Sequence, residues 1–255
     1  MARPSTAPPI ANVREGDFLL GIGVSFGAEQ TFPLSGFQGD LLSAGQLTAA
    51  YAITDRAVLK AEWEGVRLLR IEETAPSAIQ LDDGTADGRT ADAGDVRIAL
   101  TWAPFTLGDD LALGGWVAVE LPNSRQNRGI GTNTTNALMG AILSRHSDRL
   151  TVTGRLGLGI LESPLRPFSQ DDVIAYGVDA LITATNRLRL VASVAGRTNP
   201  RRSVSLGLED TGVVRAGAEY RLDGWRLDAG VGHGFAHRSP RWQADLGLSW
   251  VGRGD

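Results

Sequence analysis

The sequence contains no cysteine among its 255 residues. This absence excludes disulfide bonds, thiolate metal ligands and thiolate catalysis. The chain also lacks an apolar run near the roughly 20 residues that a membrane-spanning helix needs. A basic excess is missing too, since the net charge is -4 and the pI is near 5.5. We therefore expect no nucleic-acid partner.

The N-terminal stretch MARPSTAPPIANVREGD lacks the apolar segment of a secretory signal peptide. Either the protein is not exported, or a signal has been removed and Met1 added. We favour removal, because the rest of the sequence has the pattern of an exported membrane protein. Residues 1–15 are expected to form a flexible periplasmic tail, and residues 16–252 a single domain.

Apolar and polar residues alternate along most of the chain, which predicts β-strands with two unlike faces. In RLTVTGRLGLGI, Leu156, Leu158 and Ile160 share one face, while Thr153 and Arg155 share the other. Similar runs predict about twelve strands, each close to the 9–11 residues of a tilted membrane strand. They cover residues 17–26, 45–53, 59–64, 96–102, 111–121, 134–145, 149–160, 173–182, 187–197, 213–222, 225–235 and 242–250.

The connections between these runs alternate between short and long. Short turns are expected at residues 54–56, 108–110, 146–148, 185–187 and 223–224, and longer loops at 31–40, 73–93, 122–133, 162–171, 198–210 and 236–240. Outer-membrane barrels have this organisation, with tight periplasmic turns and longer outer loops.

The period of two fits a soluble barrel with an apolar core as well as a membrane barrel with an apolar exterior. Two features favour the membrane barrel. Aromatic residues cap the apolar face, as with Phe18 and Phe26 or Trp242 and Trp250, and their spacing matches a ~25 Å apolar band. The polar face mixes arginines and carboxylates with small residues, which suits a confined lumen. The predicted fold is an all-β, antiparallel, up-and-down transmembrane β-barrel of about 12 strands.

This orientation assigns a role to each face. The charged face is expected to line the lumen, through Lys60, Glu62, Glu64, Arg97, Glu120, Arg155, Asp179, Arg189, Arg197, Arg215, Glu219, Arg221, Arg226, Asp228 and Asp245. The aromatic residues of the other face are expected to form girdles at the lipid interface, through Phe18, Phe26, Tyr51, Trp102, Tyr220, Trp225, Phe235, Trp242 and Trp250.

One hairpin is predicted in register. Asp223-Gly224 separates two alternating runs, and this dipeptide favours a two-residue turn. Arg221 then faces Arg226, and Glu219 faces Asp228, so like charges lie directly opposite one another. The diagonal pairs Arg221–Asp228 and Glu219–Arg226 would compensate. We expect a cluster of four charges in the lumen just above this turn.

Several segments resemble the outer-membrane barrels of the phenol-degradation MetA-pathway (transporter-like) family. QLTAAYAITDRAVLKAEWEG is similar to that family's early strand–turn–strand, and GDVRIALTWAPF to its next strand. VAVELPNSRQNRGIGTNTTNALMGAILSRHSDRLTVTGRLGLGI resembles its central segment, although Asn123 stands where a Thr-Gly pair is expected after Leu121-Pro122. The resemblance implies an outer-membrane barrel that passes small, often hydrophobic compounds.

No enzymatic or metal-binding motif is prominent. A lipid-modifying enzyme would need a Ser/His-type constellation on the lipid face, for which His233 with Ser239 or Ser249 is the candidate. An interfacial histidine is the simpler interpretation, and His146 falls in a short turn. The acidic loop 73–93 lacks the calcium-loop spacing, so we expect a solvated outer loop, no metal and no cofactor.

The sequence therefore favours a channel of the bacterial outer membrane, with membrane lipid, lipopolysaccharide and small-molecule solutes as its partners. The alternative is a closed outer-membrane barrel with a structural or lipid-modifying enzymatic role. About twelve strands give an interior between the filled eight-stranded and the open sixteen-stranded cases, so strand number leaves both open. The solute and the oligomeric state do not follow from the sequence.

Overall fold

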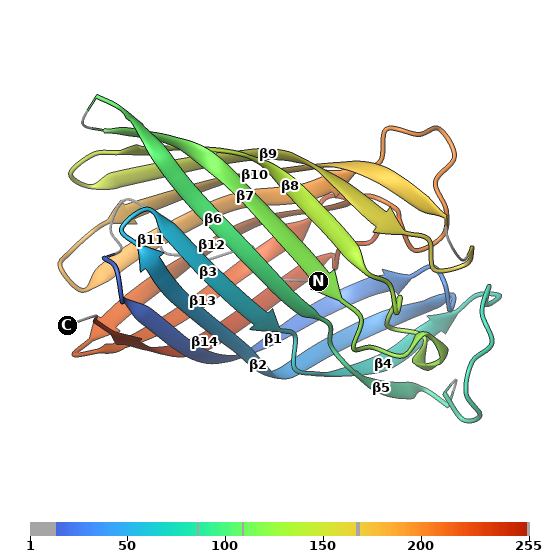
Figure 1. The fold of residues 1–255 in the computed structure, drawn as a ribbon. Coiled ribbons are helices and arrows are strands. Elements are labelled where there is room, and N and C mark those ends of the chain that lie inside the picture. Colours follow the sequence, from blue (N-terminus) through green and yellow to red (C-terminus); the bar gives the residue numbers. More distant parts are fainter. Residues whose placement is uncertain (1–13, 86, 109, 167–168, 254–255) are drawn as a thin grey trace.

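The computed structural model is a closed cylinder of tilted antiparallel strands (Figure 1). It describes residues 14–253 except 86, 109, 167 and 168, so most of the expected N-terminal tail lies outside the described residues. The strands are β1 (Phe18–Phe32), β2 (Phe37–Thr54), β3 (Ala57–Trp63), β4 (Val66–Thr74), β5 (Arg89–Ala93), β6 (Val96–Leu107), β7 (Leu111–Leu121), β8 (Asn136–His146), β9 (Leu150–Glu162), β10 (Gln170–Thr183), β11 (Leu188–Thr198), β12 (Thr211–Leu222), β13 (Trp225–Gly234) and β14 (Trp242–Gly252). No helix in the described part of the chain is long and apolar enough to cross a membrane.

The fourteen segments make a barrel of twelve strands. β3 and β4 both pair with β2 and together act as one interrupted strand. β6 pairs with β3 and β5 with β4, so β5 and β6 form the next interrupted strand. β1 pairs with β2 on one side and with β14 on the other, which closes the sheet. The predicted fold class is confirmed.

The interruption of β3–β4 lies at a glycine. Gly65 has φ +77, and its amide oxygen accepts a hydrogen bond of 2.7 Å from Gly94 N, at the matching break between β5 and β6. A Cβ at Gly65 would collide with the carbonyl oxygen of Ala44 on β2. The backbones therefore approach here as only glycine allows, and the local twist of the wall increases.

Short and long connections segregate to opposite ends, as predicted (Figure 1). Several predicted boundaries are wrong. The expected loop 31–40 is mostly strand, because β1 and β2 reach Phe32 and Phe37; β4, which occupies residues 66–74, was missed, and β5 occupies the end of the expected loop 73–93. The longer loops at this end are residues 75–88, 122–135, 163–169, 199–210 and 235–241.

These boundaries differ because the polarity pattern inverts near the long-loop end. There the inner face is apolar, and Phe32, Phe37, Leu41, Leu69 and Ile130 form a buried cluster. The outer face of the same strands is polar, with Asp40, Arg70 and Arg89 in one cross-strand row. The prediction that polar residues face the lumen along the whole length of each strand is therefore wrong in this region.

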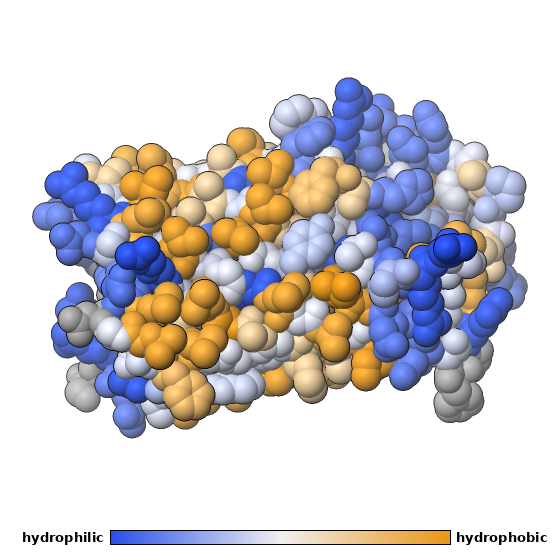
Figure 2. Space-filling model, turned by 90° about the horizontal axis from the view of Figure 1, so that it is seen from above, coloured by the Kyte–Doolittle hydropathy of each residue, from blue (hydrophilic) through white to orange (hydrophobic). Residues whose placement is uncertain are grey.

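In the middle of the barrel the apolar face is outside. Figure 2 shows an apolar band on the outer surface, between hydrophilic ends. In the stretch 149–160, Leu156 and Leu158 are 62% and 64% exposed, whereas Gly157 and Gly159, which alternate with them, are buried. The soluble alternative, with its apolar face as the core, is excluded for this part of the wall.

Candidate functional site in the lumen

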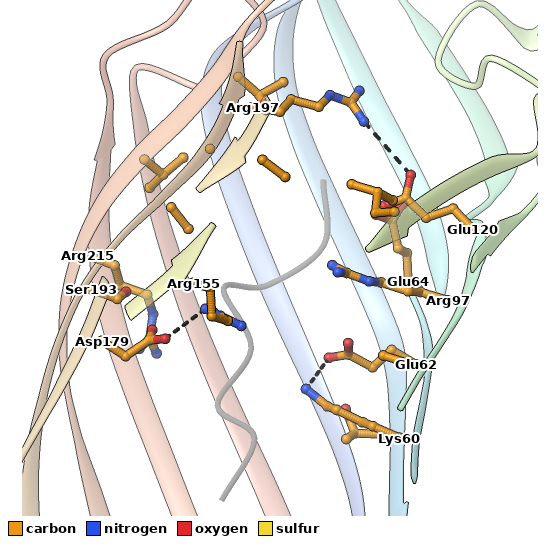
Figure 3. Close-up of a pocket in the computed structure, with 18 of the residues that line it drawn as sticks. Lys60, Glu62, Glu64, Arg97, Glu120, Arg155, Asp179, Ser193, Arg197 and Arg215 are labelled. Carbon is orange, nitrogen blue, oxygen red and sulfur yellow. Dashed lines mark hydrogen bonds and ion pairs between the residues drawn. The ribbon is translucent and has the colours of Figure 1, made fainter. Parts of the chain in front are cut away.

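A cavity of about 380 Å³ runs between the inner walls of the barrel (Figure 3). Twelve of the fifteen residues expected in the lumen line it: Lys60, Glu62, Glu64, Arg97, Glu120, Arg155, Asp179, Arg189, Arg197, Arg215, Glu219 and Arg226. Asp228 and Asp245 are buried in the wall, and Arg221 is exposed at the short-turn end.

Tight ion pairs occupy the wall formed by β9–β14. Arg215 donates from Nε and Nη2 to the two carboxylate oxygens of Asp245, at 2.8 and 2.5 Å, and both side chains are only 4% exposed. Such a two-point pair is strong and directional. Arg155 on β9 donates to Asp179 on β10 at 2.7 Å. On this wall each of these cations is neutralised by its neighbour.

The opposite wall carries a different arrangement. Lys60, the single lysine of the chain, lies 2.6 Å from Glu62. Arg97 on β6 is directly opposite Glu62 on β3 and Glu120 on β7. No ion pair joins Arg97 to a carboxylate among the described residues, and its Nε has no hydrogen-bond partner. Its guanidinium instead points into the lumen (Figure 3).

Glu120 is engaged from elsewhere. It accepts a hydrogen bond of 3.1 Å from Asn136 Nδ2 on β8, and Arg197 on β11 approaches to 3.8 Å from across the lumen (Figure 3). This long ion pair joins strands that are not neighbours in the sheet. Glu62 is engaged by Lys60, and Glu120 by Asn136 and Arg197, so neither carboxylate opposite Arg97 pairs with it.

The predicted hairpin is confirmed in register. Arg221 pairs with Arg226 and Glu219 with Asp228 along β12 and β13. Glu219 lies 3.8 Å from Arg226, as the diagonal argument expects. The predicted four-charge cluster is wrong in its membership. Arg221 is exposed, and Arg189 from β11 approaches Glu219 to 3.8 Å from the other side.

An apolar patch on the inner wall was missed by the sequence analysis. It is formed by Ala103, Trp116, Ala118, Leu138, Ile142 and Ala175, which pack together as one buried cluster. Trp116 faces Gly140 on β8, which faces Gly157 on β9. A Cβ at Gly157 would lie 2.7 Å from the indole ring, so this glycine makes room for it. Trp116 shares the parity of Glu120, and that was the available signal.

Two arginines of the outer lumen were also missed. Arg67 lies on β4, the strand that was not predicted, 3.7 Å from Glu64 and 5.9 Å from the centre of the Phe32 ring. Arg238 comes from the loop 235–241, donates to the carbonyl oxygen of Gly207 and lies 3.7 Å from Glu209. Burial and the neighbouring Arg197 lower the pKa of Arg238 to about 10. Loop residues that fold inward carry no periodicity from which to predict them.

The predicted girdle residues fall at two levels. Phe18, Tyr51, Trp102, Tyr220, Trp225 and Trp250 lie toward the short-turn end, and Phe26, Phe235 and Trp242 toward the long-loop end. The rings of Phe18 and Trp250 meet edge to face at 4.9 Å. All but Phe18 and Trp102 are at least 40% exposed. Their contact with lipid remains a prediction.

The catalytic candidates are not assembled. The His233 ring packs 4.7 Å from that of Trp242 at the long-loop end, while Ser249 pairs with Arg226 at the other end of the same hairpin. The Ser239 hydroxyl accepts a hydrogen bond from Gly212 N. His146 Nδ1 lies 2.7 Å from the Thr151 hydroxyl. Within the described residues, no group of three His, Asp or Glu side chains is arranged to hold a metal ion.

The acidic loop 73–93 does more than face solvent. Asp92 accepts from Arg125 N at 2.6 Å, and neighbouring Asp95 accepts from Asn123 N and Ser124 N at 3.0 Å. Asp82 accepts from Asn127 Nδ2 at 2.5 Å. These carboxylates hold the adjacent loop 122–135 in place over the outer mouth.

No family model and no curated protein matches this sequence. Solved structures match its fold. The COG4313 outer membrane channel from Pseudomonas putida F1 has a TM-score of 0.70 at 14% identity, over 97% of this chain and 100% of that one. The translocator domain of autotransporter NalP from Neisseria meningitidis has a TM-score of 0.53 at 11% identity, over 94% and 90% of the two chains. NanC porin has a TM-score of 0.53 at 10% identity, over 94% and 100%.

These similarities establish that the chain has the fold of outer-membrane β-barrels. The fold that the sequence resemblance implied is thereby confirmed. At such low identity, nothing about the solutes or partners of the matched proteins transfers to this chain.

Proposed function

We propose that this protein is a channel of the bacterial outer membrane, that it lets small solutes pass through its lumen, and that it catalyses no reaction. The observation that carries the proposal is the cavity between two charged walls inside a barrel whose middle exterior is apolar. An apolar exterior band flanked by polar ends fits a bilayer. A charged inner wall fits the passage of polar or partly polar solutes.

The charges on the wall favour a weak preference for anions. Nine arginine or lysine side chains and six carboxylates line the cavity among the described residues. Because many of them are paired with each other, the net field is small. Lipid and lipopolysaccharide are the proposed partners of the exterior, through the predicted girdle residues at its two levels.

The test is single-channel conductance of the purified protein in a planar lipid bilayer. We expect discrete conductance steps and a reversal potential that indicates slight anion preference in a salt gradient. The protein should also require detergent and migrate differently on SDS gels before and after boiling. A heat-modifiable barrel without conductance would overturn the channel and leave the closed structural barrel.

A further inference from the structure

The outer wall carries two arginines side by side toward the long-loop end. Arg70 on β4 and Arg89 on β5 are directly opposite one another in register, and both are exposed on the outside of the barrel. We call them the arginine pair. On its other side, Arg70 has Asp40 of β2 as its register partner. Like charges directly opposite one another destabilise a strand pair, so an anion bound between the two guanidiniums would relieve a repulsion.

The nearby carboxylates do not neutralise the arginine pair. Asp40 Oδ1 accepts a hydrogen bond of 3.2 Å from the backbone N of Glu29. Within the part of the chain that the structure describes, no ion pair joins Arg70 or Arg89 to an acidic side chain. Each guanidinium presents several N–H donors in a fixed plane. The pair therefore offers a surface rich in donors to an anion that approaches from outside the barrel.

A cleft of about 770 Å³ lies at the arginine pair, and both of its arginines line it. Loop 75–88 contributes Asp83 to the lining, and loop 122–135 contributes Arg128. Arg128 lies 3.3 Å from Asp82, so its charge is already balanced by a carboxylate. The charge that remains for a ligand in this cleft is that of the arginine pair, and Asp83 disfavours a position of the anion close to its own carboxylate.

An apolar row borders the arginine pair on the side of the middle of the barrel. Its members are partners in register across β1, β2, β4 and β5, are exposed, and line the same cleft: Phe26, Leu42, Leu68 and Ala91. Leu68 precedes Arg70 by two residues, so the two rows lie about 7 Å apart. The arginine pair thus marks the level where the apolar band of the exterior gives way to a hydrophilic end (Figure 2).

Lipid headgroups lie at this level when the apolar band spans the hydrocarbon core. In the proposed orientation the long loops face the outside, so these headgroups belong to the outer leaflet. Lipopolysaccharide fills that leaflet, and its lipid A carries phosphates on a sugar from which the acyl chains descend. Arginine binds phosphate through two parallel hydrogen bonds, and basic pockets on membrane proteins bind phosphorylated headgroups.

We infer that this cleft is a binding site for a phosphate of lipid A. The phosphate meets the arginine pair, and an acyl chain of the same molecule lies against the apolar row. A free phosphate ion would use the charges alone, so the apolar row assigns the site to the lipid. The inference rests on the orientation in the proposed function and gives its lipopolysaccharide contact a defined site. It does not depend on whether the lumen conducts.

The test measures lipid binding to the purified full-length barrel by native mass spectrometry from detergent. The probe is diphosphoryl lipid A, and the comparison is the same lipid A after enzymatic removal of its phosphates. We expect the intact lipid to bind about tenfold more tightly, because the charge-assisted hydrogen bonds are lost with the phosphates. An excess of inorganic phosphate should not displace lipid A, because the free ion makes no contact with the apolar row.

Substitutions divide the site into its two halves. Arg70→Gln and Arg89→Gln together should weaken lipid A binding about tenfold and leave the dephosphorylated lipid unchanged. Leu68→Ala should weaken both lipids alike, because it removes part of the apolar contact. The matched control is Arg202→Gln, at an exposed arginine of loop 199–210 outside the cleft, which should change neither affinity. All these positions are exposed, so each variant should keep the gel shift of the folded barrel.

Equal affinity for the two lipids, or unchanged lipid A binding in the double variant, would overturn the site. Displacement of lipid A by inorganic phosphate would overturn the assignment to the lipid. Conductance without a preference for phosphorylated lipid A would leave the channel standing and remove the site. Lipid A binding to a barrel that does not conduct would keep the site and remove the channel.

Discussion

The two walls of the lumen use similar residues in opposite ways. On β9–β14, which we call the locked wall, two arginines bind carboxylates tightly, at 2.5 Å for Arg215–Asp245 and 2.7 Å for Arg155–Asp179. Arg189 and Arg226 of the same wall each lie 3.8 Å from Glu219. On the opposite wall, β3–β4 and β5–β6 are interrupted at Gly65 and Gly94, and no ion pair joins Arg97 to a carboxylate within the part of the chain that the structure describes. In the first wall, these ion pairs join β12 to β14 and β9 to β10 and so stabilise the barrel. The second wall contains the Lys60–Glu62 pair at 2.6 Å together with Arg97, which no carboxylate of the described residues engages.

The comparison also shows that register alone does not decide pairing. Arg97 has a carboxylate directly opposite on each neighbouring strand and binds neither. Arg215 binds Asp245, which is two strands away. Long arginine side chains in a lumen reach past the adjacent strand, and the partner is set by which carboxylates other residues have already engaged.

The largest expected effect is on stability, from the locked wall. Arg215→Met leaves Asp245 buried without its partner, which should destabilise the barrel by about 3–5 kcal/mol. The loss is measured as a lower urea concentration at which half of the unboiled protein no longer migrates as the folded barrel on an SDS gel. Arg97→Met, the matched change on the other wall, should shift the midpoint little. Equal losses in the two variants would erase the distinction between the walls.

The next effect compares a glycine of each wall. Gly65 and Gly224 have φ +77 and +83, so alanine is strained at both. At Gly224 a Cβ has its nearest neighbour at 3.7 Å, and strain alone should cost about 1 kcal/mol. At Gly65 the Cβ also collides with backbone, so we expect about 2–3 kcal/mol. A smaller loss of stability for Gly65→Ala than for Gly224→Ala in the same urea assay would show that the backbone at the interruption shifts to accommodate the methyl group.

A smaller effect should follow from narrowing the space beside the indole. Gly157→Ala places a methyl group 2.7 Å from the Trp116 ring and against the Met139 carbonyl oxygen. We expect a loss of about 1–2 kcal/mol, with a shifted tryptophan emission maximum as the ring moves. Gly154→Ala on the same strand is the control, because its nearest neighbour is at 4.0 Å. An unchanged spectrum would mean that the ring does not depend on this glycine.

The smallest effect in free energy concerns ion preference. Arg97→Glu should move the reversal potential toward cations by about a threefold change in permeability ratio, because the charge of a half-buried side chain that lines the lumen is reversed. Arg155→Glu should move it in the same direction but also lower the urea midpoint, because Asp179 loses its partner. If Arg155→Glu changed selectivity without a stability loss, the ion pair of the locked wall would carry no structural role.

Much of this architecture follows from the sequence. The period of two determines the strands. It places Arg155 on the lumen face of β9 and both Leu156 and Leu158 on the outer face. A two-residue turn determines the register of residues 219–228, because a hairpin of that length has only one pairing. Trp116 was equally predictable, since it shares the parity of Glu120. These features are local, and each depends on residues a few positions apart.

Other features depend on contacts between strands far apart in the chain. Near the long loops, Leu69 and Phe37 point inward and Arg70 outward, because the inner face of the barrel is covered there by the loop residue Ile130 and buries an apolar cluster. Which carboxylate each arginine binds depends on side chains brought together by closure, as Arg197 reaches Glu120 from β11 to β7. Sequence therefore determined which face each residue occupies through the middle of the wall, because that choice is set by backbone geometry. Tertiary structure alone decided that Arg97 pairs with neither carboxylate opposite it, because that outcome depends on the other charges that share the lumen with it.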